Sequence, residues 1–77
     1  MRGREVLKEV MKIKNLSNAD LAKRLNVSNA TIWERLNNKN VKDIPVSLLA
    51  QMLRAMDYKI IVVPNNTRTP ADSFEIE

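Results

Sequence analysis

The chain contains polar side chains that could take part in chemistry, but their types and spacing do not assemble a catalytic set. Histidine and cysteine are both absent from the 77 residues, which removes the usual general base and the thiol nucleophile. The carboxylates fall on different predicted elements without the spacing of metal ligands; they include Asp20, Glu34, Asp43 and Asp57. We therefore expect no enzymatic activity, no metal site and no cofactor.

The most informative stretch, residues 17–39, has the pattern of two short helices joined by a tight turn. Ser17 and Asp20 have the spacing of a capping box, in which each side chain accepts a hydrogen bond from the other residue's backbone amide. Asn26 follows the last apolar residue of this helix, and asparagine tolerates the left-handed conformation that ends a helix. Ser28 then caps a second helix, which we expect to end at residue 36 or 37.

These residues resemble a known family, the helix-turn-helix regulators of the phage Cro and repressor type. Residues 25–32, LNVSNATI, resemble that family's turn and the start of its recognition helix, and residues 36–39, LNNK, resemble its closing Leu-Asn-Gly-Lys. The resemblance covers roughly residues 6–63. It implies a mainly α fold, a repressor-like domain of four helices, in a phage or bacterial setting.

The chain departs from the family pattern at four positions. Asn26 and Asn38 stand where the family most often has glycine, which a left-handed backbone tolerates from asparagine. Arg35 occupies a position that is commonly apolar and buried, so its charged end must reach solvent or pair. Asp57 replaces the usual glycine after the fourth helix, which leaves that corner less defined.

The resemblance implies that one face of the second helix meets the major groove of DNA, through Asn29, Ala30, Trp33 and Glu34. Asn29 could form paired hydrogen bonds with adenine, Ala30 could contact a thymine methyl, and Glu34 could accept from cytosine. Asn29 could instead be simply solvent-exposed, and Glu34 could form an intrachain salt bridge. Trp33 lies at the flank of the helix and could either contact DNA, the reading we favour, or fold over the core beside Val27 and Leu36.

Phosphate contacts require donors at helix N-termini and in nearby loops. The candidates are Asn18, Lys23, Ser28, Thr31, Lys39, Asn40 and Lys42. Lys39 and Lys42 could also do no more than solvate their loop, because exposed lysines are common.

The rest of the chain predicts two further helices and one or two C-terminal β-strands. Apolar spacing indicates a helix over residues 4–14 and another that begins at Pro45 or Ser47 and ends near residue 57. Residues 58–63, YKIIVV, are rich in β-branched side chains and predict a strand, and residues 73–77 predict a weaker one. We therefore expect a helix-turn-helix domain over residues 1–57 and a strand and tail over 58–77.

The predicted strand would leave its backbone groups open at an edge, which favours pairing with a second copy of the chain. The residues expected to form this dimer contact are Tyr58, Ile60, Ile61, Val62 and Val63. Alternatively, Phe74 and Ile76 fold back within one chain.

The charge is distributed unevenly along the chain. Residues 1–64 contain twelve lysines or arginines against six acids, a net of +6, whereas residues 65–77 have one arginine against three acids, a net of −2. A basic body fits a polyanion partner, although a surplus of this size could also serve solubility alone. The longest apolar run, residues 60–63, is too short to span a bilayer.

Together these features predict sequence-specific binding of double-stranded DNA by a cytoplasmic, repressor-like regulator of transcription. The resemblance implies a homodimer on a palindromic operator and no membrane association. The alternative function is a protein-binding module, such as an antitoxin or adaptor, that captures a partner through its C-terminal strand or tail.

Overall fold

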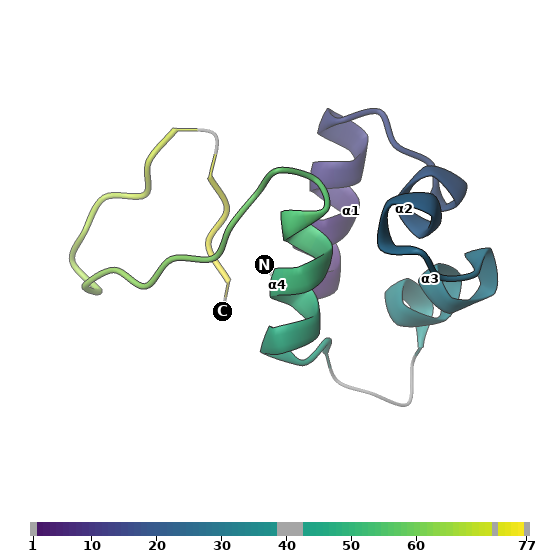
Figure 1. The fold of residues 1–77 in the computed structure, drawn as a ribbon. Coiled ribbons are helices and arrows are strands. Elements are labelled where there is room, and N and C mark those ends of the chain that lie inside the picture. The colour runs from purple at the N-terminus through teal and green to yellow at the C-terminus, as the bar shows by residue number, and fades with distance from the viewer. Residues whose placement is uncertain (1, 39–42, 72, 77) are drawn as a thin grey trace.

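The computed structural model describes residues 2–38, 43–71 and 73–76, and Figure 1 shows their arrangement. The helices of this described part are α1 (Gly3–Ile13), α2 (Asn18–Leu25), α3 (Asn29–Asn37) and α4 (Val46–Arg54). Helix α1 packs against α4 and α3, and α2 packs against α3. A long C-terminal tail extends on the side of α4 that faces away from α2 and α3 (Figure 1). No described helix has the length and apolar character needed to cross a membrane.

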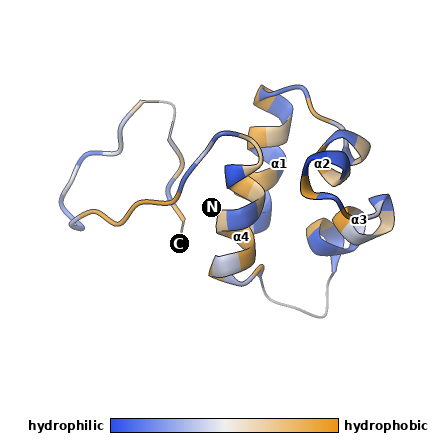
Figure 2. Cartoon of the chain, in the orientation of Figure 1, coloured by the Kyte–Doolittle hydropathy of each residue, from blue (hydrophilic) through white to orange (hydrophobic). Residues whose placement is uncertain are grey.

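The core forms where the apolar faces of the helices meet, as their spacing predicts. Figure 2 shows hydrophobic residues recurring along each helix between hydrophilic ones. The buried side chains are Val6, Leu7, Val10, Met11, Leu21, Ala22, Ile32, Leu36, Ile44, Leu49, Met52, Leu53 and Met56. The prediction of four helices with amphipathic faces is confirmed.

The two ends of α2 have the local geometry that the sequence predicts. The Ser17 Oγ atom accepts a hydrogen bond from the Asp20 amide at 3.2 Å, and Asp20 Oδ2 accepts from the Ser17 amide at 2.9 Å. The hydrogen bond that the carboxylate accepts from the Ser17 amide, followed by its interaction with the Ser17 hydroxyl, lowers the pKa of Asp20. Asn26 ends α2 in the left-handed conformation with φ 58° and ψ 45°. The amino end of α2 is therefore fixed by side chains, and its carboxyl end by the left-handed backbone of Asn26.

Asn38 and Asp57 both stand where the resembled family most often has glycine, but their backbone conformations differ. Asn38, which the prediction places in a left-handed conformation, is extended with φ −69° and ψ 108°, so that expectation is wrong. Asp57 does adopt a positive φ of 66°, and it lies in a tight turn after α4. The turn starts at residue 55, so α4 ends three residues earlier than the apolar pattern suggests.

Asp43 joins the segment before α4 to the start of α1, a connection that the sequence analysis missed. Its Oδ2 atom accepts from the Gly3 amide at 2.8 Å, and its Oδ1 atom accepts from the amides of Arg4 at 3.2 Å and Ile44 at 2.8 Å. Desolvation acts to raise the pKa of Asp43, but the three amide hydrogen bonds outweigh it and lower the pKa. A carboxylate from 40 residues away thus caps the amino end of α1.

The predicted C-terminal strands are absent from the described residues, so this part of the fold prediction is wrong. Residues 58–63 and 73–76 have no strand assignment, because neither segment pairs its backbone with another described segment. Tyr58, Ile60 and Phe74 pack partly against the core, whereas Ile76 is exposed. The alternative that the end of the chain folds back is therefore confirmed for Phe74 and not for Ile76.

Candidate nucleic-acid interface

Helix α3 is held in place by a capped amino end and a buried inner face. The Ser28 Oγ atom accepts from the Thr31 amide at 3.1 Å and lies 2.8 Å from Thr31 Oγ1. On the inner face Ile32 is fully buried and Leu36 nearly so. The orientation of α3 is thus fixed by its contacts with α1 and α2, which leaves the opposite face free to bind a partner.

The residues predicted to read bases, Asn29, Ala30, Trp33 and Glu34, are all exposed. The Trp33 side chain is 61% exposed, so the alternative that it folds over the core is wrong. Exposure of a large aromatic ring on a polar helix is a feature of surfaces that bind partners. The structure therefore brings the four predicted residues together on one accessible surface.

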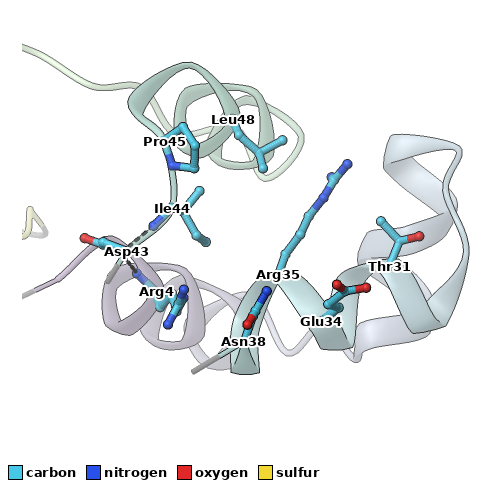
Figure 3. Close-up of a pocket in the computed structure, with 9 residues that line it drawn as sticks. All are labelled: Arg4, Thr31, Glu34, Arg35, Asn38, Asp43, Ile44, Pro45 and Leu48. Carbon is cyan, nitrogen blue, oxygen red and sulfur yellow. Dashed lines mark hydrogen bonds between the residues drawn. The ribbon is translucent and has the colours of Figure 1, made fainter. Parts of the chain in front are cut away.

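Glu34 is exposed on α3. No ion pair joins its carboxylate to another residue in the described part of the chain, so the alternative of an intrachain salt bridge finds no support there. Thr31 and Glu34 also line the rim of a cavity of about 290 Å³ beside α3 (Figure 3). Its remaining lining comes from α1, the carboxyl end of α3 and the start of α4, namely Arg4, Arg35, Asn38, Asp43, Ile44, Pro45 and Leu48.

Arg35 is the charged residue that stands at a commonly apolar and buried position of the resembled family. The residue is half-buried, and Figure 3 shows its side chain extending from α3 toward α4, which carries Leu48. This partial burial fits the expectation that the apolar stem of Arg35 covers part of the protein surface.

The predicted phosphate-binding residues fall into two groups. Asn18 is the first residue of α2, Lys23 is exposed on that helix, and Ser28 and Thr31 lie at the amino end of α3. The predictions for Lys39, Asn40 and Lys42 lie outside the described residues. Arg24, a further basic residue of α2, makes a hydrogen bond within the fold, since its Nη1 atom donates to the carbonyl of Ala55 at 3.0 Å.

Residues 2–38 match a family model described as winged helix-turn-helix DNA-binding. The matched segment is 37 of the 77 residues and contains α1, α2 and α3. The match supports a helix-turn-helix DNA-binding family, and it does not single out the phage Cro and repressor type. No curated protein and no solved structure matches the chain significantly.

The matched segment coincides with the geometric unit described above. Helices α2 and α3 pack against each other across the Asn26 turn, and α1 supports α3 from behind. Among the described residues no strand follows α3, and the matched segment covers α1, α2 and α3. In helix-turn-helix proteins the helix after the turn, which corresponds here to α3, is the one that lies in the major groove.

Proposed function

We propose that this chain is a sequence-specific regulator of transcription that binds double-stranded DNA as a dimer on an inverted-repeat operator. The observation that supports this proposal is the exposed outer face of α3, which is built on buried Ile32 and Leu36 within the segment that matches DNA-binding helix-turn-helix proteins. A rigid helix with exposed polar and apolar side chains fits the major groove in shape and chemistry.

Specificity in this proposal comes from the outer face of α3. Asn29 would pair with adenine, Glu34 would accept from cytosine, and Ala30 and Trp33 would contact apolar groups of the bases. Affinity would come from contacts with phosphates, made by Asn18, Lys23, Ser28, Thr31, Lys39, Asn40 and Lys42. The net charge of +6 on residues 1–64 favours both encounter and binding.

The tail supplies the proposed dimer contact, which makes residues 1–57 the DNA-binding domain and residues 58–77 the dimerisation segment. Ile61, Val62 and Val63 are exposed in the protomer, with Val62 at 97%. Figure 2 shows this hydrophobic stretch in the segment that leaves α4. An extended apolar segment with unpaired backbone groups gains most by pairing with its own copy about a two-fold axis. Such a dimer would present two α3 helices to successive major grooves, about 34 Å apart.

The experiment that tests this function is selection of bound duplexes from a random pool, with the full chain. We expect an enriched inverted repeat, which would report both sequence reading and two-fold symmetry. The variant Asn29→Ala should lose the preference at one base position of each half-site and weaken binding there by about 1–3 kcal/mol.

Two control variants separate base reading from general effects. Gln51→Ala changes an exposed residue on α4 and should leave the selected sequence intact. Lys42→Ala should weaken all duplexes alike and flatten the salt dependence. A pool that remains random after selection, or an unchanged preference in Asn29→Ala, would overturn the proposal for α3.

The second candidate function, a protein-binding module such as an antitoxin or adaptor, is favoured by the same exposed apolar segment. A foreign chain could pair with residues 61–63 in place of a second copy. Steep loss of duplex binding with added salt supports the DNA-binding function. Salt-insensitive association with another protein, without retention of duplex at low salt, would favour the module instead.

A further inference from the structure

We infer that α3 reads a pyrimidine step in which a cytosine amine lies beside a pyrimidine C5-methyl group. This inference rests on the proposed placement of α3 in the major groove and specifies the base chemistry that α3 selects there. Its basis is the combination of one carboxylate and two apolar side chains on the outer face of the helix.

The three side chains are neighbours on the helix surface. At about 100° per residue, Glu34 lies roughly 40° to one side of Ala30, and Trp33 lies roughly 60° to the other side. Glu34 projects almost directly away from the buried side of the helix, which Ile32 and Leu36 define. The outer face therefore presents a carboxylate, a methyl group and an aromatic ring in order around the helix.

The carboxylate restricts which bases can lie against it. An ionised Glu34 only accepts hydrogen bonds, so it matches a base amine and repels the acceptor atoms of guanine and the O4 atom of thymine. Cytosine presents its N4 amine in the major groove without a neighbouring acceptor of its own, whereas adenine places N7 beside its amine. Glu34 therefore favours cytosine over the other three bases.

The apolar pair selects a methyl group rather than a polar base edge. Trp33 is largely exposed, and Ala30 adds a second apolar surface one turn away. Asn37 lies between them around the helix, but its Nδ2 atom donates to the Trp33 carbonyl at 2.8 Å. This bond ties the Asn37 amide to the helix backbone, so the apolar surface beside Glu34 comes from Ala30 and Trp33. The C5-methyl of a pyrimidine is the apolar group that the major groove offers there.

The same methyl chemistry has two sources in DNA, namely thymine and 5-methylcytosine. Both carry the methyl on C5, on the major-groove edge next to the C4 substituent. A surface that accepts this group should therefore respond when the methyl is removed from thymine and when it is added to cytosine.

The test uses the half-site enriched in the random-pool selection, with atomic changes in the DNA. Each thymine is replaced in turn by deoxyuridine, which removes only the C5-methyl, and duplex affinity is measured by fluorescence anisotropy of labelled DNA. We expect about a three- to fivefold loss at a thymine that adjoins the selected cytosine, the effect of one buried methyl group. In a second arm, the cytosine beside it is replaced by 5-methylcytosine, which should strengthen binding; a loss of affinity there would contradict the methyl reading.

Two variants assign the effect to the side chains. In Trp33→Ala the difference between the thymine and deoxyuridine duplexes should shrink, with Ala30 keeping part of the methyl contact. Because Trp33 is exposed, the variant should fold normally. Glu34→Gln replaces an acceptor by a group that also donates, so the preference for cytosine at its position should relax. A duplex with deoxyuridine placed outside the enriched half-site serves as the DNA control.

The outcomes separate this inference from the proposed function. If an inverted repeat is enriched but deoxyuridine has no effect at any position, or if the effect is undiminished in Trp33→Ala, the methyl reading by this apolar pair is wrong and the DNA-binding function stands. If the enriched sites contain no cytosine that is sensitive to Glu34→Gln, the cytosine assignment is wrong. If nothing is enriched, both the proposed function and this inference fail.

Discussion

Similar apolar residues are buried in the helical body and exposed in the C-terminal tail. In the body, Val10 is fully buried among the helices, whereas in the tail Val62 is 97% exposed. The body satisfies its backbone polar groups within its helices and capped turns. In the described tail, Tyr58 donates from its backbone to the Leu53 carbonyl and Thr67 to the Pro64 carbonyl, and no strand ladder is formed.

This difference separates a part of the chain that makes its backbone hydrogen bonds locally from a part for which we propose a partner. Helices make their backbone hydrogen bonds locally, so α1 to α4 need only each other's apolar faces. A β-prone segment has to find its partner elsewhere, and the described chain offers residues 58–63 none. The outer face of α3, the proposed DNA-binding surface, lies in the part whose helices make their own backbone hydrogen bonds.

The largest expected effect comes from breaking the proposed use of the tail. Ile61→Pro removes a backbone donor and prevents central strand pairing. We expect the variant to sediment as a monomer and to lose about a hundredfold or more in affinity for the full inverted repeat, with half-site binding nearly unchanged. Its thermal unfolding should match the wild type, because residue 61 contributes little to the protomer. A wild-type chain that is monomeric at high concentration would mean that the tail does not mediate a dimer.

The next prediction compares the same substitution in the two regions. Val10→Ala removes two methyl groups from the core and should lower the free energy of unfolding by about 2 kcal/mol. Val62→Ala removes the same groups from an exposed side chain and should change it by less than about 0.5 kcal/mol. Urea unfolding of both variants at low protein concentration measures the contrast. Equal losses would show that the tail shares in the core of the protomer.

The next prediction concerns the stability that Asp43 contributes through its hydrogen bonds with the start of α1. Asp43→Asn weakens the cap on α1 and should cost about 1 kcal/mol at neutral pH. Since the folded pKa of Asp43 is lowered, the stabilisation is complete above the unfolded value of 3.8 and is lost as the pH falls through the folded pKa. The difference between wild type and variant in urea unfolding should therefore shrink on acidification below pH 3.8. A difference that stays constant down to pH 2 would contradict the role of the charge.

The smallest effect concerns the corner where the body meets the tail. Asp57 has a φ of 66°, a conformation that glycine adopts without strain. Asp57→Gly should raise the free energy of unfolding by up to about 1 kcal/mol, whereas Asp57→Val should lower it. Thermal melts of the two variants provide the comparison. Destabilisation by glycine would mean that the aspartate side chain, rather than the turn geometry, holds this corner.

Much of the body could be predicted because its determinants are local. The Ser17–Asp20 capping box, the Asn26 turn and the spacing of Ile32 and Leu36 all act within one or two helical turns. The Asp43 cap on α1 could not be predicted, because nothing in the sequence relates residues 3 and 43 before the fold brings them together. The same applies to the bond from Arg24 to the Ala55 carbonyl.

The error in the tail has a different origin. Residues 58–63 have a high strand propensity, but propensity describes how a residue fits a sheet and does not provide the second strand. At the site, the exposure of Asn29, Ala30, Trp33 and Glu34 followed from helical geometry, whereas the partial burial of Arg35 beside the cavity required the structure. Sequence could thus identify the face of α3, and packing determined which of its groups remain available.

The most direct test of the central claim is the fluorescence of Trp33, the single tryptophan of the chain, during titration with the selected duplex. If the outer face of α3 enters the major groove, its emission should change in proportion to occupancy and return when competing unlabelled duplex or high salt releases the DNA. A scrambled duplex of equal length should give a smaller change at the same concentration. Full binding of the selected duplex by anisotropy, with no change in Trp33 emission and no loss of affinity in Trp33→Ala, would contradict the account.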